Sequence, residues 1–261
     1  MAIPKTIHYC WFGTNPIPNR LQYCIKSWKK LLPDYTFILW NEENTVFDCD
    51  FIKTAYAAKK WAFVADFVRI KSVYDYGGIY MDTDMLLLRS LDSFLNHDCF
   101  FVAEHNLSIG VGIFGAEKNN AFIKKCLDTY YAEEVILSTS PERVTNTYLE
   151  VYNADKKFDE TIYEEGLTIF KPEYFYALPY QKLFDIHKYK KYLTPKSYGV
   201  HLWEGSWHNY NELMLLRRKE YKKAFKRIIK SIFKERKFNY TYLKKIIVAF
   251  KDAVLTKNAF K

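Results

Sequence analysis

Residues 65–84 read ADFVRIKSVYDYGGIYMDTD, and this stretch decides how the rest of the chain is interpreted. Its first part has the spacing of a helix, on which Asp66 and Arg69 lie about one turn apart, and two glycines end that helix. A short apolar strand follows and leads to Asp82 and Asp84. If the strand continues through both residues, their carboxylates point to the same side, because alternate residues of a strand share a face.

Two carboxylates held side by side repel each other unless a cation lies between them. Mg²⁺ and Mn²⁺ prefer oxygen ligands and take one or two carboxylates together with substrate phosphates. Asp-x-Asp alone is common in solvated turns and favours no metal site by itself. In combination with Asp66, Arg69 and residues 77–80, the same tripeptide indicates a divalent-metal site at Asp82 and Asp84.

The whole run resembles the sugar-binding region of DXD-containing glycosyltransferases, specifically glycosyltransferase family 32, and the related catalytic domains of the large clostridial glucosylating toxins. The opening strand IHYCWFG at residues 7–13 and the late HLWEGSW at residues 201–207 carry the same resemblance. Residues 106–116 resemble the segment that borders the sugar pocket. The resemblance implies an α/β fold of the GT-A type, a Rossmann-like mixed sheet flanked by helices, and transfer with retention of anomeric configuration.

The resemblance also implies roles for individual residues. Asp84 is expected to bind the metal directly, and Asp82 to bind it through water or to bind ribose and sugar hydroxyls. His201 would complete the metal site, because a neutral imidazole is a good ligand for a divalent transition metal. A half-buried structural histidine beside tryptophans is the alternative for His201. The cofactor is expected to be Mn²⁺ or Mg²⁺.

Seven residues are expected to bind the nucleotide-sugar donor. Three of them, Asp66, Arg69 and Asp82, are also expected to be catalytic, together with Asp84. Arg69 offers a planar fork of donors that suits an aspartate or a phosphate. Trp11 ends the first strand, where it would lie against the base, although a core position is the competing interpretation. The expected donor-binding residues are Trp11, Asp66, Arg69, Tyr80, Asp82, Ser206 and Trp207.

Composition is that of a folded protein with a large core. The chain has 261 residues, of which 49% are hydrophobic and 18% aromatic, which fits one sizeable α/β domain with a helical appendage. Its five cysteines are widely spaced and include no Cys-x-x-Cys pair, which argues against a zinc site or a disulfide framework and fits a reducing compartment. With neither a signal peptide nor an apolar anchor in the sequence, a cytoplasmic protein is expected.

Positive charge is concentrated in the last fifty residues. Residues 212–261 contain 16 Lys or Arg and four acids, a net of +12, whereas the whole chain carries +9, so residues 1–211 sum to −3. We therefore expect a catalytic domain over 1–211 and a basic, amphipathic helical extension over 212–261. Apolar and cationic residues at helical spacing favour peripheral contact with anionic membrane at its inner face. A helical subdomain with a solvated lysine face is the alternative, and no nucleic-acid-binding motif accompanies the charge.

These features predict a metal-dependent retaining glycosyltransferase. It would move a hexose from a nucleotide sugar, a UDP-sugar in the first instance, to a glycan or a lipid-linked oligosaccharide, as in capsule or surface polysaccharide assembly. A phosphatase of the haloacid-dehalogenase type also uses Asp-x-Asp at a strand end, but normally with Thr or Val next, where this chain has Met85. A non-catalytic protein that binds lipid or polyanions through its basic tail is the third interpretation.

Overall fold

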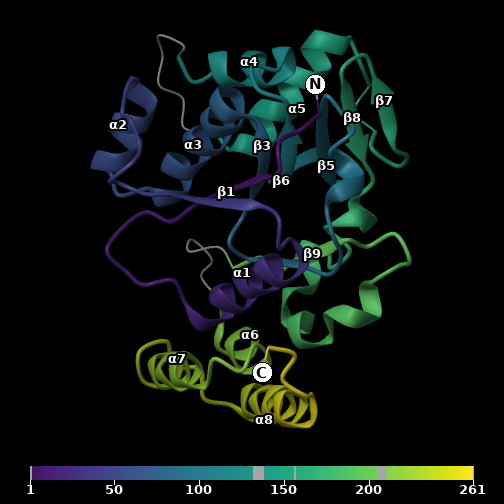
Figure 1. Cartoon of the computed structure of the whole chain (residues 1–261). Helices are drawn as coiled ribbons and strands as arrows, with labels where there is room; N and C mark the ends of the chain where they lie inside the picture. The colour runs from purple at the N-terminus through teal and green to yellow at the C-terminus, as the bar shows by residue number, and fades with distance from the viewer. Residues whose placement is uncertain (1, 132–137, 156, 205–209, 261) are drawn as a thin grey trace. The chain divides into compact units, whose positions relative to one another are not determined.

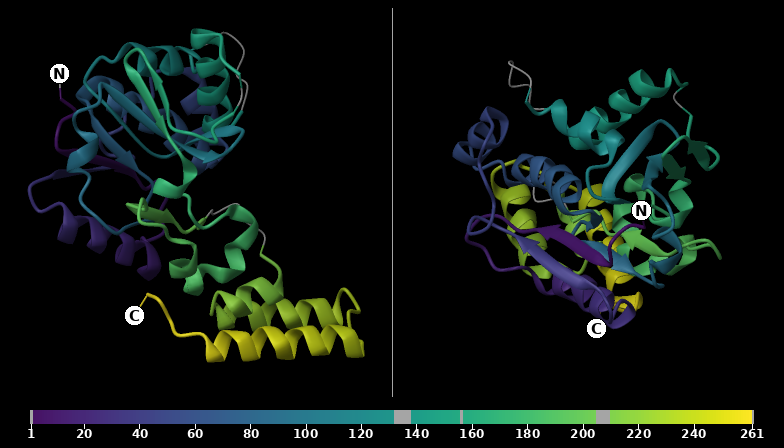
Figure 2. Two further views of the ribbon diagram at one scale, coloured as in Figure 1. Left: turned by 90° about the vertical axis from the view of Figure 1, so that its right-hand side faces the viewer. Right: turned by 45° about the horizontal axis from the view of Figure 1, so that its top comes forward.

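The computed structural model describes residues 2–131, 138–155, 157–204 and 210–260. The chain divides into two compact units, and Figures 1 and 2 show the elements of both. The sheet unit comprises Met1–Ala177 and Thr194–His201. The helical unit comprises Leu178–Leu193 and Leu202–Lys261.

The sheet unit alternates strands and helices over its first half and is richer in strands over its second half. Its elements, in chain order, are β1 (Thr6–Cys10), α1 (Asn19–Leu31), β2 (Thr36–Trp40), α2 (Asp50–Ala57), α3 (Trp61–Tyr76), β3 (Gly78–Met81), β4 (Met85–Leu87), β5 (Cys99–His105), β6 (Ser108–Ala116), α4 (Ala121–Asp128), α5 (Ser140–Tyr152), β7 (Ile162–Glu164), β8 (Leu167–Phe170) and β9 (Gly199–His201), with single 3-10 turns at Asp92–Phe94 and Pro172–Tyr174.

Seven of these strands form one mixed sheet in the order β2-β1-β3-β6-β5-β8-β7. β1 runs parallel to both β2 and β3, β6 is antiparallel to β3 and β5, and β8 returns parallel to β5. Helix α3 packs against β1, β3 and β6, and α5 packs against β6. The predicted α/β fold, a Rossmann-like mixed sheet flanked by helices, is therefore confirmed.

The two-glycine break after α3 is a structural requirement. Gly77 ends the helix at φ +66°, and Gly78 starts β3 at φ +109°, a backbone region that side-chain-bearing residues rarely adopt. A Cβ on Gly78 would lie 2.7 Å from the carbonyl oxygen of Thr6 on the neighbouring strand. The buried imidazole of His8 secures the break, since its Nε2 lies 2.8 Å from the Gly77 carbonyl oxygen and its Nδ1 accepts from Trp40 Nε1 at 3.1 Å.

The chain does not continue as one strand through the two aspartates, so this part of the sequence-based prediction is wrong. β3 ends at Met81, and the Met85 N–H donates to the Asp82 carbonyl at 2.9 Å, which closes a turn between β3 and β4. The reason is a change of partner: β3 pairs within the seven-stranded sheet, whereas β4 pairs with β9 in a separate two-stranded sheet. A turn, and not strand alternation, orients Asp82 and Asp84.

The helical unit consists of a 3-10 segment (Tyr180–Tyr192) and the helices α6 (Glu212–Arg217), α7 (Tyr221–Phe233) and α8 (Tyr240–Leu255). Helix α6 packs against both α7 and α8 around a small apolar cluster. Helices therefore occupy the stretch in which the sequence predicted them, while a domain boundary at residue 211 stays a prediction. None of the helices in the described residues is long and apolar enough to cross a membrane.

Candidate active site

Asp82, Asp84 and His201 meet just beyond the carboxyl end of β3, an interior strand of the seven-stranded sheet. One ligand atom from each residue lies within 4.8 Å of the ligand atoms of the other two. His201 Nε2 is 3.1 Å from Asp84 Oδ1 and 4.0 Å from Asp82 Oδ2. The antiparallel register of β4 with β9, in which Met85 faces His201, brings the histidine to the aspartate turn.

Arg69 and Tyr80 fix the orientation of the Asp82 carboxylate from behind. Arg69 Nη1 lies 3.4 Å from Asp82 Oδ2, and Nη2 lies 3.4 Å from Oδ1. The Tyr80 hydroxyl donates to Asp82 Oδ1 at 2.9 Å, and the guanidinium lies over the Tyr80 ring at 4.8 Å. Arg69 also pairs with Asp66 at 3.1 Å and donates to the Val111 carbonyl at 3.0 Å. The donors of Arg69 are thus directed at protein groups.

Burial and charge act in opposite directions on the ionisable groups of this network. Burial opposes the charge of Arg69, but Asp82, Tyr80 and Asp66 raise the pKa of its guanidinium well above the usual value. Burial raises the pKa of the Asp66 carboxyl, and Arg69 offsets part of that rise. For His201, burial disfavours protonation, yet Asp84 and Asp82 raise the pKa of the imidazole above 6.5. A cation that enters the group therefore competes with a proton on His201.

The donor set of the group fits a divalent cation. Two carboxylates supply the oxygen ligands that Mg²⁺ and Mn²⁺ prefer, and an imidazole is the ligand type that transition metals accept readily. Metal-binding carboxylates are usually held in position by hydrogen bonds from neighbouring residues. Arg69 and Tyr80 make such hydrogen bonds to the Asp82 carboxylate. Asp82, Asp84 and His201 are the residues that would hold Mn²⁺ or Mg²⁺.

Strand β6 passes directly against the group, and at Gly112 a side chain larger than hydrogen would be tightly packed against it. A Cβ on Gly112 would lie 3.0 Å from the Tyr176 hydroxyl, 3.1 Å from Asp82 Oδ2 and 3.5 Å from His201 Nε2. The Gly112 N–H donates to the Tyr176 hydroxyl at 2.9 Å, and the ring of Tyr176 meets that of His201 edge-on at 5.4 Å. The expectation that residues 106–116 border the site agrees with this placement.

Glu104 and Tyr176 belong to the surroundings of the group although sequence reasoning missed both. Glu104 lies at an irregularity of the β5–β6 ladder, between the pairs Ala103–Ile109 and His105–Ser108. Burial raises the pKa of its carboxyl, while the charges of His201 and His105 oppose that rise. No hydrogen bond or ion pair holds Glu104 within the described part of the chain. The sequence does carry one signal for Glu104, because it is an acidic residue directly after the apolar first part of β5.

The remaining predicted donor-binding residues are placed differently. Tyr80 is 1% exposed, so it acts on the site through Asp82 and Arg69. Trp11 is half-buried just after β1, and its Nε1–H donates to the Asn15 carbonyl at 2.7 Å. Across residues 2–131, 138–155, 157–204 and 210–260, no hydrogen bond or ion pair joins Trp11 to the aspartates. Ser206 and Trp207 lie outside the described residues.

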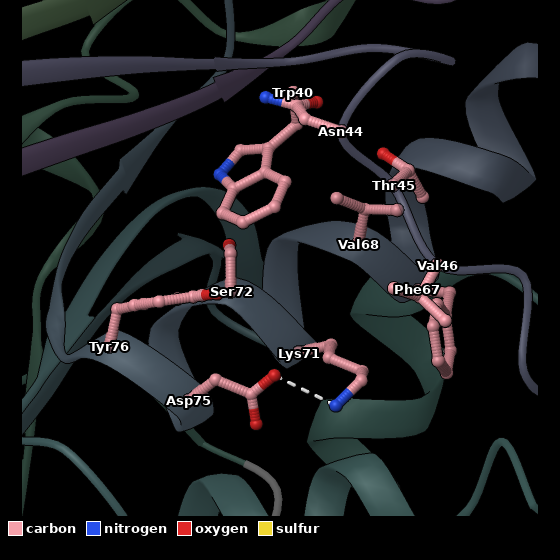
Figure 3. A pocket seen from close by; sticks show the side chains of 10 residues that line it. All are labelled: Trp40, Asn44, Thr45, Val46, Phe67, Val68, Lys71, Ser72, Asp75 and Tyr76. Atoms are coloured by element: carbon pink, nitrogen blue, oxygen red, sulfur yellow. Dashed lines mark hydrogen bonds and ion pairs between the residues drawn. The ribbon is translucent and has the colours of Figure 1, made fainter.

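A separate shallow pocket, of about 390 Å³ including its open mouth, lies along the outer side of α3 (Figure 3). The Lys71–Asp75 ion pair, 2.8 Å between Nζ and Oδ2, lies within it, and Trp40 lines another side. Its lining includes neither Asp82, Asp84 nor His201. The pocket is therefore distinct from the group formed by Asp82, Asp84 and His201.

Two family models match the chain. Residues 18–101 match the glycosyltransferase sugar-binding region containing a DXD motif, and residues 115–232 match the alpha 1,4-glycosyltransferase conserved region. Both models describe glycosyltransferases, so the chain is a glycosyltransferase. The first match spans α3 and the aspartate turn, which are the elements that build the site.

Characterised relatives carry the same region within longer chains. Inositol phosphoceramide mannosyltransferase 3 of Schizosaccharomyces pombe is 34% identical over 127 residues, which cover 47% of this chain and 35% of the relative. Human alpha-1,4-N-acetylglucosaminyltransferase is 26% identical over 185 residues, which cover 67% of this chain and 50% of the relative. The chain thus spans a third to a half of the length of these two relatives.

Among solved structures, the PaToxG glycosyltransferase aligns with this chain at a TM-score of 0.47 and 17% identity. The alignment covers 58% of this chain and 71% of that one.

Proposed function

We propose that this glycosyltransferase moves a hexose from a nucleotide sugar, a UDP-sugar in the first instance, to a glycan or glycolipid acceptor, and that it needs a divalent cation. The convergence of Asp82, Asp84 and His201 in front of the Arg69–Asp66 pair is the observation that carries the proposal. Family membership supports the transfer chemistry, and the donor set supports the cation. A phosphatase is disfavoured because the aspartates belong to the matched sugar-binding region.

The chain's own residues supply orientation and charge. When bound, a divalent cation supplies Lewis-acid stabilisation of the negative charge that develops on a leaving diphosphate. Arg69 and Tyr80 keep the Asp82 carboxylate in one orientation, so that little reorganisation is needed during the reaction. The pairing of β4 with β9 holds His201 against Asp84 in the same way.

Glu104 is our candidate for the sugar side of the reaction. Glycosyl transfer passes through a transition state with positive charge on the sugar ring, which a nearby carboxylate stabilises. The charges of His201, His105 and Asp82 act on the Glu104 carboxyl, which places it within electrostatic reach of the group. Irregularities in strand pairing commonly redirect a side chain next to an active site. Retention of configuration stays an expectation from the family resemblance.

For the acceptor, we favour a glycolipid over a capsular polysaccharide. The name of the Schizosaccharomyces pombe relative describes a mannosyltransferase that acts on inositol phosphoceramide, a lipid. A lipid-linked acceptor also fits a protein that works at the inner face of a membrane from the cytoplasm, which is the localisation we propose. The other acceptor that we consider is a lipid-linked oligosaccharide of capsule or surface polysaccharide assembly.

Release of free nucleoside diphosphate from a panel of UDP- and GDP-sugars tests the proposal. Each donor is incubated with the protein and Mn²⁺, Mg²⁺ or chelator, with and without glycolipid acceptors. We expect chelator-sensitive release from one donor, increased by the right acceptor. The absence of release from every donor, together with no cation-dependent binding of UDP or GDP, would overturn it. Hydrolysis of a simple phosphate ester without any nucleotide sugar would instead support the phosphatase.

A further inference from the structure

Helix α7 carries a row of large apolar side chains that its own unit does not cover. Phe225, Ile229 and Phe233 follow each other at intervals of four residues and are 52%, 58% and 79% exposed. The same helix buries Ala224 and Ile228 against the cluster it shares with α6. The row, which we call the α7 stripe, is therefore additional to the apolar face that α7 uses for folding.

Helix α8 buries small apolar residues and exposes large ones, which is the reverse of the usual distribution on an amphipathic helix. It buries two small residues, Ala249 and Ala253, and exposes larger ones, among them Ile247, Phe250 and Val254. These three follow the i, i+3, i+7 spacing of a single helix face. We call them the α8 face. Large exposed apolar patches on soluble domains mark contact sites, since leaving them in water is unfavourable.

Lysines flank both apolar surfaces. On α7, Lys222, Lys226 and Lys230 recur at intervals of four and are all exposed, beside the α7 stripe. On α8, Lys244 and Lys251 are exposed within one turn of the α8 face. With a net charge of +12 over residues 212–261, the surface combines apolar side chains and cations in the pattern of helices that lie in a membrane interface.

We propose that the α7 stripe and the α8 face dock on an anionic membrane surface. Lipid headgroups attract the lysines, and the acyl boundary accepts the apolar side chains. A second copy of the chain fits less well, because two surfaces of the same high charge repel each other. A water-soluble polyanion would satisfy the lysines only and would leave six large apolar side chains exposed. An anionic membrane provides partners for the lysines and for the exposed apolar side chains.

Co-sedimentation of the full chain with vesicles tests the proposal. The vesicles contain either phosphatidylcholine alone or phosphatidylcholine mixed with phosphatidylserine. We expect the full chain to bind the anionic vesicles and to leave the neutral ones in the supernatant. Replacing Lys222, Lys226 and Lys230 by Gln should lower the partition coefficient by at least about tenfold, because each lysine near an anionic surface adds to the attraction.

Two further variants separate the proposal from its competitors. The triple substitution of Phe225, Ile229 and Phe233 by Ser should also lower binding to anionic vesicles by at least about tenfold at unchanged charge. Replacing the exposed Lys26, Lys29 and Lys30 of α1 by Gln removes the same charge from the sheet unit and should leave binding within about twofold. Circular dichroism establishes that each variant is folded.

Three outcomes would overturn the proposal. The first is failure of the full chain to bind anionic vesicles. The second is binding that depends on the lysines but not on the α7 stripe, which would indicate a polyanion-binding surface. The third is a stable dimer in solution that the Ser substitutions dissociate. None of these readouts requires transferase activity, so they are independent of the function proposed above.

Discussion

In the sheet unit the charged residues of the site are buried and paired with one another, whereas in the helical unit large apolar side chains are exposed. Arg69 and Asp66 are 6% and 9% exposed, and their charges are satisfied by protein groups. Phe233 on α7 is 79% exposed. Burying charge is unfavourable unless a precise arrangement of polar groups results, and exposing apolar surface is unfavourable unless a partner covers it. The first pattern indicates chemistry and the second indicates contact.

The largest effect is expected at the aspartate turn. Asp84→Asn removes a carboxylate from the proposed metal site, so turnover of the donor should fall by at least about a thousandfold even at saturating Mn²⁺. Asp75→Asn is the matched control, because it neutralises an aspartate of the same unit that pairs with Lys71 outside the site. Donor turnover within a few-fold of wild type in Asp84→Asn would refute the metal assignment.

Arg218 is an exception to this difference between the two units, because it is a fully buried charge in the helical unit. It pairs with Glu204 and Glu220 and lies over the ring of Tyr210. Arg218→Met removes the cation that pairs with Glu204 and leaves Glu220 paired with Lys223, so it should lower the free energy of unfolding of the helical unit by about 3–5 kcal/mol. Denaturant unfolding followed by circular dichroism measures it, and the exposed Lys230→Met should change stability by less than about 0.5 kcal/mol.

This variant also tests whether chemistry and contact are separable. Because Asp82, Asp84 and His201 all belong to the sheet unit, Arg218→Met should keep cation-dependent donor hydrolysis at temperatures below its transition. Parallel loss of hydrolysis and of helical signal would show that the two units depend on each other.

Gly112→Ala tests whether tight packing around the buried charges of the sheet unit matters for turnover. The added methyl group meets Asp82, Tyr176 and His201, so donor turnover should fall by about 10–100-fold. Gly166→Ala is the control for the loss of a glycine away from the group, since nothing lies within 4 Å of the position of its Cβ, although Gly166 itself has φ +71°. It should cost about 1 kcal/mol of stability and leave the turnover of folded protein unchanged. Equal loss of turnover in both variants would contradict steric crowding at the group.

Glu104→Gln should have a smaller and more selective effect. It keeps the shape of the side chain and removes its charge, so kcat should fall by about tenfold or more while KM for the donor and the affinity for Mn²⁺ stay unchanged. The exposed Glu165→Gln controls for loss of negative charge in the same unit. A change confined to cation affinity would instead assign Glu104 to the support of the metal group.

The smallest effect concerns His8, which is buried and has no charged partner among the described residues. Burial lowers the pKa of its imidazole, against the effect of its hydrogen bond to the Gly77 carbonyl. The unfolded chain therefore binds a proton that the folded chain resists, so the free energy of unfolding decreases as the pH falls through about 6.5. In His8→Gln, Tm should depend less steeply on pH between about 7.5 and 5.5. An unchanged slope would contradict a neutral His8.

Local signals in the sequence predicted much of the sheet unit. The helix expected before the two glycines is α3 (Trp61–Tyr76), the short apolar strand expected after them is β3 (Gly78–Met81), and the opening strand expected at residues 7–13 contains most of β1 (Thr6–Cys10). These elements follow from periodicity and from the glycines that end them. The meeting of His201 with Asp84 followed from the family resemblance only, because spacing along the chain carries no information about two residues so far apart.

The rest depended on partners distant in sequence. Whether residues 82–87 continue β3 is decided by the availability of β9, and the position of Glu104 is decided by the irregular pairing of β5 with β6. Tyr176 enters the site because Gly112 leaves room for its hydroxyl. On α8 the helical period was evident, but periodicity does not reveal that the alanines face inward and the larger residues outward.

The pairing of β4 with β9 also sets the order in which the site is completed during synthesis. His201 follows Asp84 by 117 residues (201 − 84), so a growing chain already carries both aspartates long before the histidine leaves the ribosome. Until β9 docks, the aspartate turn lacks His201 and β4 lacks its strand partner. If the group binds a cation as proposed, truncated or partly made chains would bind it more weakly and would not consume the proposed nucleotide-sugar donor.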